Sequence, residues 1–321
     1  MSELGDVALT TPDREVRAAG ATATLEIDGV RLVDRLAAVY NAVLAVVWAI
    51  LIPQWSLAAL LFLVHAAAAA MPVLLRRTPQ RLTRPVRILR DIYPLLWITA
   101  WWIELDSIRR LLHDANFDRV IGELDRAIFG THLDQIFLPS LNDLWFSELM
   151  YLAYFVYYLT VIVPLLYALL WGTAAMKRDM TFRVVLIYVA CFVVYIAFPV
   201  DGPHWLTEHF QGPHQAGLFY RIEQLLQSGG AALGCSFPSS HVAASTTMAI
   251  LGFRWLSKPA AYALTVGAVG VIVSTVYTQN HYAIDSVAGI IWAFWIQWTV
   301  APALIHWWEC RRGAAAAAGS S

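Results

Sequence analysis

The chain has 321 residues, of which 59% are hydrophobic and only 14% are charged. Soluble proteins average about 25% charged residues, so this composition argues against a soluble globular domain. The formal net charge of −1 excludes the strongly basic character of most nucleic-acid-binding proteins, and we expect no nucleic-acid partner. The three cysteines, Cys191, Cys235 and Cys310, lie far apart in the sequence and predict no disulfide framework.

The first 75 residues divide into a polar segment and a pair of apolar stretches. Residues 1–35 mix both charge signs and contain no long apolar run, so we expect a cytoplasmic N-terminal segment without a cleavable signal peptide. The apolar stretches 36–52 and 55–75 are close to the roughly 20 residues that a spanning helix needs. Because few residues separate them, the sequence predicts an accessory two-helix hairpin over 36–75.

Six further apolar stretches follow. They cover 92–107, 144–173, 183–200, 239–256, 260–279 and 283–307. The sequence therefore predicts an all-α fold, a polytopic membrane helix bundle of about eight transmembrane helices. The more polar residues 108–143 are expected to lie along a membrane interface. Residues 308–321 are expected to form a cytoplasmic tail with a disordered, alanine-rich end.

The distribution of basic residues predicts the orientation. Of the 22 Arg and Lys residues, 17 fall in segments on the side of the N-terminus and 5 on the other side. Because cytoplasmic loops are enriched in Arg and Lys, both termini are predicted to be cytoplasmic. The richness in Ala and Arg, with only two Lys, indicates a GC-rich bacterium. We therefore expect a multi-pass protein of the bacterial inner membrane.

Two short polar segments interrupt the apolar sequence at the extracytoplasmic ends of predicted spans. They are Phe237-Pro238-Ser239-Ser240-His241 and Asn280-His281-Tyr282-Ala283-Ile284-Asp285. Ionisable side chains are costly at such positions in a membrane protein, so each of them suggests a function. The predicted topology brings both histidines to the same surface.

These side chains predict a phosphoryl-transfer site. Because His281 and Asp285 are four residues apart, the carboxylate can orient the imidazole across one helical turn, as in a nucleophile–base triad. His241 follows Ser239 and Ser240 at an expected helix N-terminus, where N–H groups favour phosphate and the hydroxyls cap the helix or bind the same anion. We infer that His281 attacks phosphorus, Asp285 stabilises the phosphohistidine, and His241 protonates the leaving oxygen. This chemistry requires no metal and no cofactor.

The same two segments carry a family resemblance. Phe-Pro-Ser-Ser-His-Val-Ala at 237–243 and Thr-Val-Tyr-Thr-Gln-Asn-His-Tyr-Ala-Ile-Asp-Ser-Val-Ala-Gly at 275–289 resemble motifs of the type 2 phosphatidic acid phosphatase superfamily. They look most like the branch containing fungal inositol phosphorylceramide synthases, which has Phe-Pro-Ser-x-His and His-Tyr-x-x-Asp motifs. The stretch from Phe198 to Trp205 is similar to a further turn of that branch.

The resemblance covers roughly 144–307 and implies a catalytic membrane domain over 92–307 with a six-helix core. It also implies metal independence and the roles inferred above, with His281 as nucleophile, Asp285 as its partner and His241 as acid.

The sequence departs from the wider superfamily in the phosphate-binding motif. Phosphatases of the superfamily carry a lysine, six further residues and then Arg-Pro. Arg77 and Arg84-Pro85 fit that spacing, but the predicted topology places them on the cytoplasmic side, so we reject this match. At the position where the motif belongs, Tyr195 and Gly202 stand instead and carry no charge.

Other residues must therefore bind the phosphate. Arg221 is the only Arg or Lys between residues 200 and 238, and His204 lies in a Gly-Pro turn in the same loop. The predicted substrate-binding residues are Ser239, Ser240, His204, Arg221 and Gly202.

The other histidines considered are interpreted as structural residues. His204, His209 and His214 recur every five residues, which matches neither a helical nor a strand period, so we predict no metal site there. His65 lies in the middle of a predicted span and is expected to bond to a neighbouring helix.

The sequence predicts an integral membrane lipid phosphatase or phosphotransferase that cleaves a lipid phosphoester or diphosphate at the extracytoplasmic face. The alternative of an inositol-phosphate-type headgroup transferase to a lipid alcohol uses the same chemistry with another acceptor, and the sequence leaves this choice open. A membrane transporter with a His/Asp proton relay is an alternative of another class, which predicts ionisable groups at the bilayer midplane. The expected partners are the lipid substrate and the membrane, and the oligomeric state stays open.

Overall fold

The computed structural model describes residues 25–318 except 28, 77–82, 113 and 231. Most of the predicted N-terminal segment 1–35, as well as Arg77 of the rejected phosphate motif, lies outside the described residues. A two-stranded antiparallel pair, β1 (Glu26–Ile27) and β2 (Val30–Arg31), precedes the helices.

The rest of the described chain is almost entirely helical. The α-helices are α2 (Leu32–Leu51), α3 (Leu57–Arg76), α4 (Arg84–Leu112), α5 (Asp118–Phe129), α6 (Asp134–Ser140), α7 (Leu144–Trp171), α8 (Ala174–Ala197), α9 (Pro203–Leu206), α10 (Leu218–Gly230), α11 (Ser240–Trp255), α12 (Lys258–Tyr277), α13 (Ala283–Trp295) and α14 (Ala301–Ala318). A 3₁₀ turn covers Pro213–Ala216, and a π-helical turn, Ile296–Val300, joins α13 to α14.

Six helical segments of the described chain are long and apolar enough to cross a membrane. They are α2, residues 57–75 of α3, α7, α8, α12 and the α13–α14 segment Ala283–Arg311. The all-α membrane bundle is thereby confirmed. The two other predicted spans, 92–107 and 239–256, are helical as α4 and α11, but α11 has only 16 residues. The alanine-rich end of the chain, predicted to be disordered, continues α14 as far as Ala318.

The bundle is built around α8 and α11. In α8, 72% of the most apolar window is buried, compared with 22% in α3, so α8 is central and α3 peripheral. Helix α11 packs against α7, α8, α12 and α13. A Cβ at Gly289 of α13 would lie 2.7 Å from the Ser239 carbonyl oxygen, so only glycine allows α13 to approach the start of α11 this closely.

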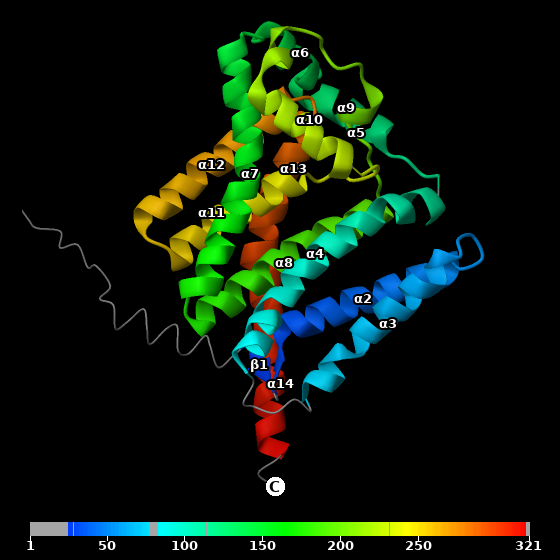
Figure 1. Cartoon of the computed structure of the whole chain (residues 1–321), viewed down its shortest axis with the longest axis vertical. Coiled ribbons are helices and arrows are strands. Elements are labelled where there is room, and N and C mark those ends of the chain that lie inside the picture. Colours follow the sequence, from blue (N-terminus) through cyan, green and yellow to red (C-terminus); the bar gives the residue numbers. More distant parts are fainter. Residues whose placement is uncertain (1–24, 28, 77–82, 113, 231, 319–321) are drawn as a thin grey trace, which may run out of the picture.

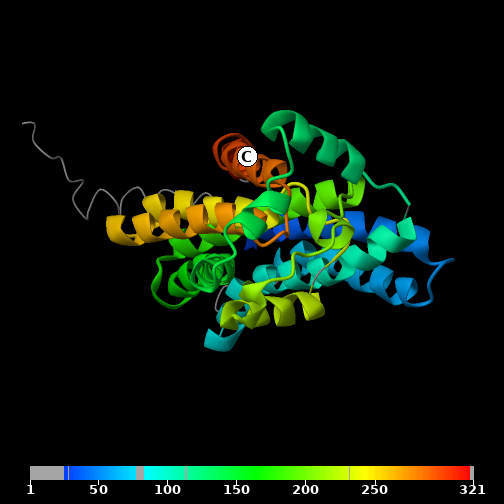
Figure 2. The ribbon, with the colours of Figure 1, turned by 90° about the horizontal axis from the view of Figure 1, so that it is seen from above.

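Short helices form a cap at one end of the bundle. Helices α5, α6, α9 and α10 lie together at the upper end in Figure 1, where α11 and α13 also begin. In the view from above in Figure 2, α5 and α10 lie toward opposite edges of the bundle. The predicted interfacial segment 108–143 thus contributes α5 and α6 to this cap.

The N-terminal hairpin is joined to the rest of the bundle by buried polar side chains. His65 of α3 is fully buried, with its ring nitrogens 2.7 Å from Asn41 Oδ1 of α2 and 2.8 Å from Glu104 Oε2 of α4. The expected bond from His65 to a neighbouring helix is therefore confirmed. Because burial makes unpaired polar groups costly, this network favours one arrangement of the three helices.

We predict that His65→Leu destabilises the protein. The change leaves the Asn41 amide and the Glu104 carboxylate short of a partner, at a cost of about 1–3 kcal/mol. The measurement is the Tm of the purified protein in one detergent. His306→Leu is the matched control, since His306 is exposed on α14. Equal Tm values for the two variants would contradict the prediction.

Candidate active site

Ser236 joins His281 to Asp285 in a hydrogen-bonded relay. The Ser236 hydroxyl donates to Asp285 Oδ2 over 2.6 Å and lies 3.1 Å from His281 Nδ1, whereas the direct Nδ1–Oδ2 distance is 3.4 Å. Because the serine proton goes to the carboxylate, the serine oxygen accepts from Nδ1–H. The relay therefore fixes the tautomer of His281 and leaves the lone pair of Nε2 available as a nucleophile.

The helix start, rather than a helix face, brings His281 and Asp285 together. Helix α13 begins at Ala283, so His281 precedes it, and Asp285 at its third position accepts a bond from Tyr282 N–H over 3.0 Å. The prediction that the histidine and the aspartate share a helix face is wrong, because His281 belongs to the preceding loop. Their contact is nevertheless formed, since the carboxylate that caps the helix faces back along the chain.

His241 faces His281 from the second position of α11. The two imidazole centroids are 5.9 Å apart, and His241 Nε2 lies 3.3 Å from the Tyr154 hydroxyl of α7. The Tyr157 ring lies 4.2 Å from the His241 ring. The histidines of the two sequence motifs thus come together at one site, as the predicted topology required.

The start of α11 is held by its own neighbours. Tyr195 of α8 accepts a bond from Ser240 N–H over 3.1 Å and donates to the Pro238 carbonyl over 2.8 Å. Ser239 is the N-cap, and its Oγ accepts from Val242 N–H over 3.4 Å. Two N–H groups at this end are already bonded within the protein. The start of α11 therefore has fewer free N–H donors for an anion than the sequence predicted. Tyr195 therefore stabilises the turn at the start of α11.

A second turn positions Ser236. Asp118 of α5 accepts bonds from Asp201 N–H over 2.9 Å and from Gly202 N–H over 2.7 Å. Gly202 has φ = +84°, and a Cβ there would lie 2.4 Å from Ser236 Oγ. Glycine is therefore needed at this position both for its backbone conformation and for the space that the serine occupies.

The two histidines open onto a cavity of about 790 Å³. Its polar lining includes His204, Ser236, Ser240, His241, Asn280 and His281. Its apolar lining comes from α4, α7 and α8, and along α7 it extends from Tyr154 to Leu169, which is about 22 Å of helix. The cavity is therefore amphiphilic, with the histidines at its polar part.

The predicted substrate-binding residues have different environments. Ser240 and His204 line the cavity, whereas Ser239 is fully buried as the cap of α11, and Gly202 contributes space for Ser236. Arg221 is exposed on α10 and is not among the lining residues. Among the described residues, no arginine or lysine lines this cavity. The guanidinium of Arg109 approaches it from outside and lies 4.0 Å from the Asp201 carboxylate.

Burial keeps two histidines of the site neutral at pH 7. It lowers the pKa of His281 to about 4, with a backbone hydrogen bond to Ser236 acting in the opposite direction. Burial, together with the neighbouring His209 and His281, lowers the pKa of His204 to about 4. A neutral His281 has the lone pair that nucleophilic attack requires.

A polar cluster beside His281 was not predicted from the sequence. The buried Glu223 of α10 accepts bonds from Asn280 Nδ2 over 2.8 Å and from the Gln227 amide. Gln227 Nε2 also donates to Asn280 Oδ1 over 2.5 Å. Asn280 could have been found from the sequence, because it directly precedes His281. Glu223 could not, because its position in the sequence is that of an ordinary surface acid of an amphipathic helix. Burial raises the pKa of Glu223 to about 7, partly opposed by these hydrogen bonds.

We predict that Glu223 makes stability fall as pH rises. Its pKa is raised from 4.5 to about 7, so between these values the folded protein holds a proton that the unfolded chain releases. Stability is therefore lost through this window and stays lower above it, by about 3 kcal/mol at most. Glu223→Gln should match the wild-type Tm at pH 4.5 and exceed it at pH 8. A gap in Tm that does not change with pH would contradict the prediction.

The comparisons with known proteins give one match. A family model described as the PAP2 superfamily matches residues 120–299, just over half of the chain. No curated protein and no solved structure matches the chain. The matched residues include Ser236, His241, His281 and Asp285 and exclude α2, α3 and α4.

Proposed function

Because the chain belongs to the PAP2 superfamily of phosphatases and phosphotransferases, we propose that it cleaves a phosphoester or diphosphate of a lipid. We place this reaction at the extracytoplasmic face, through a phosphohistidine intermediate. The observation that carries the proposal is the position of His241 and His281 in an amphiphilic cavity of about 790 Å³. A phosphate headgroup suits the polar part of the cavity, and acyl or prenyl chains suit the apolar lining along α7.

In the first step, His281 Nε2 attacks phosphorus and the bond from phosphorus to the leaving oxygen breaks. The leaving oxygen takes its proton from the imidazolium form of His241, which the bound phosphate anion favours. The His241 ring faces His281 with the centroids 5.9 Å apart. The positive charge that develops on His281 is stabilised through Ser236 by the Asp285 carboxylate, which is fully buried. The products are a phosphohistidine and the freed lipid alcohol or lipid phosphate.

In the second step, an acceptor hydroxyl attacks the phosphohistidine. His241 takes the proton of that hydroxyl, the N–P bond breaks, and Nε2 regains its lone pair. With water as the acceptor, the product is inorganic phosphate and the enzyme is a phosphatase. With a lipid alcohol as the acceptor, the product is a new phospholipid and the enzyme is a transferase.

An inositol-phosphate-type headgroup transferase is the second candidate, favoured by one observation. Among the described residues, the cavity lacks a lysine or arginine lining, while amide and hydroxyl groups line it beside His281. Such groups suit a hydroxyl-rich headgroup, and the apolar lining offers room for a lipid acceptor. Membership of the branch that contains the fungal inositol phosphorylceramide synthases belongs to this second candidate function.

We predict that His281→Ala abolishes the reaction with a lipid phosphate substrate, because no other group replaces the nucleophile. Rapid quenching at alkaline pH of the wild-type protein with ³²P-labelled substrate should trap label on His281, since phosphohistidine survives base. His241→Asn should slow turnover by about 10²–10⁴-fold, the usual contribution of general acid–base catalysis. The control is His306→Asn, at the exposed position on α14. Full turnover by His281→Ala would disprove the mechanism.

The relay through Ser236 makes a separate prediction. Ser236→Ala should lower kcat by about 10–100-fold, which corresponds to a lost charge-assisted hydrogen bond of about 1.5–3 kcal/mol. The substrate KM should change little, because the serine orients His281 rather than the lipid. Ser228→Ala is the matched control, since Ser228 is exposed on α10. An unchanged kcat for Ser236→Ala would remove the serine from the mechanism.

The acceptor is tested by offering labelled lipid phosphate, lipid diphosphate and phosphatidylinositol, each with and without diacylglycerol or ceramide. Free phosphate as the main product in both conditions indicates a phosphatase. Label that moves to the added lipid alcohol indicates a transferase. Absence of both products with every substrate would contradict the proposed function.

A further inference from the structure

A second cluster of ionisable side chains lies in the cap, outside the lining of the amphiphilic cavity. It consists of Asp125 of α5, His132 of the following loop and Asp134 at the start of α6. One potential ligand atom from each residue lies within 4.8 Å of the others. The shortest contact is 3.1 Å, between His132 Nδ1 and Asp125 Oδ2.

Asp134 is the residue that a purely structural role leaves unexplained. Its side chain is fully buried, and neither carboxylate oxygen accepts a hydrogen bond from another described residue. A buried carboxyl group with two unpaired oxygens is costly and normally has a partner.

Asp125 and His132 alone would make an ordinary hydrogen-bonded pair. That pair satisfies the histidine nitrogen and one carboxylate oxygen, but it does nothing for Asp134 beside it. A cation bound among the three side chains would balance both buried carboxylates at once. The two buried carboxylates therefore need a positive charge nearby, and the described side chains of the cluster do not fully supply it.

We propose that Asp125, His132 and Asp134 bind a divalent transition-metal ion, with Zn²⁺ as the best fit. A mixed set of one imidazole and two carboxylates suits Zn²⁺ or Mn²⁺, whereas Ca²⁺ and Mg²⁺ take oxygen ligands almost exclusively. Zinc bonds of about 2.0–2.2 Å require ligand atoms about 3.4 Å apart, so the present separations need only small side-chain rotations.

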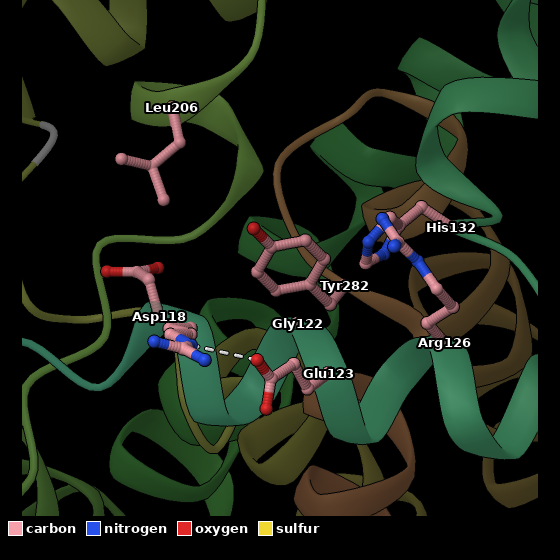
Figure 3. A pocket seen from close by; sticks show the side chains of 8 residues that line it. Asp118, Gly122, Glu123, Arg126, His132, Leu206 and Tyr282 are labelled. Carbon is pink, nitrogen blue, oxygen red and sulfur yellow. Dashed lines mark hydrogen bonds and ion pairs between the residues drawn. The ribbon is translucent and has the colours of Figure 1, made fainter.

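An open pocket beside His132 offers the ion a route to that ligand. This pocket, about 260 Å³ in volume, is lined by His132 together with Gly122, Arg126 and Tyr282. Figure 3 shows His132 on its wall, with the Tyr282 ring beside it. Water in this pocket can complete the coordination of a three-ligand site.

The site would hold the cap against the catalytic helix. Asp125 Oδ1 accepts a bond from Ile284 N–H over 3.0 Å, at the residue immediately before Asp285. An ion shared by Asp125 and Asp134 would therefore join α5, α6 and the first turn of α13. Its role is positioning, and it makes no contact with the reacting phosphate.

The test is metal binding by the purified full-length protein, which requires no turnover and is independent of the proposed reaction. Protein stripped with a chelator is incubated with ZnCl₂, desalted and analysed for zinc by mass spectrometry. We expect about one tightly held zinc per wild-type chain. Asp134→Asn and His132→Gln should each weaken binding by at least about tenfold. Glu123→Gln is the control and should bind like the wild type, since Glu123 is an exposed acid of the same helix and pocket.

Spectroscopy and thermal stability give two further measurements. Co²⁺ added to the stripped wild-type protein should give visible absorption bands of a low-symmetry, four- or five-coordinate site, and Zn²⁺ should displace them. Zinc should also raise the Tm of the wild type and of Glu123→Gln, but not that of Asp134→Asn. The proposal is overturned if the wild type retains no zinc after desalting. It is equally overturned if Asp134→Asn and Glu123→Gln bind zinc alike, or if Co²⁺ remains in its six-coordinate aqueous form.

Discussion

The short bond from the Ser236 hydroxyl to the Asp285 carboxylate is the contact on which the site depends. Asp285 is fully buried, so its charge is tolerable only where several donors reach it. The Ser236 hydroxyl and the Tyr282 N–H both donate to the same oxygen, Oδ2, and His281 Nδ1 lies 3.4 Å from it. Two segments more than forty residues apart, the turn that carries Ser236 and the start of α13, therefore have to meet at one atom. The orientation of His281 follows from that requirement.

The cap provides the positions that this meeting needs. Two aspartates of α5 bond to backbone N–H groups of other segments, Asp118 at Gly202 and Asp125 at Ile284. The first bond holds the turn against which Ser236 packs, and the second holds the first turn of α13. Short helices at the end of a membrane bundle thus act as a frame for the proposed catalytic residues. A cation among the cap carboxylates would strengthen the same frame.

The spans contribute the apolar part of the cavity and the separation between polar and apolar lining. Helices α4, α7 and α8 line it with aliphatic and aromatic side chains, and the helix starts of α11 and α13 bring the histidines to it. The family match excludes α4, although Trp102 of that helix lines the cavity. The cavity therefore extends beyond the part of the chain that the family model covers.

The sequence alone determined the membrane bundle, its main helices and the two histidine motifs, because long apolar runs and isolated ionisable groups are local signals. It could not determine that Ser236 links His281 to Asp285, since the two segments are more than forty residues apart and meet only after α13 packs on α11. It also placed Arg221 with the substrate, whereas the fold leaves Arg221 exposed and buries Glu223 of the same helix. Only the tertiary structure places other helices against an amphipathic helix. Those helices decide which of its sides is buried and which buried charges have a partner.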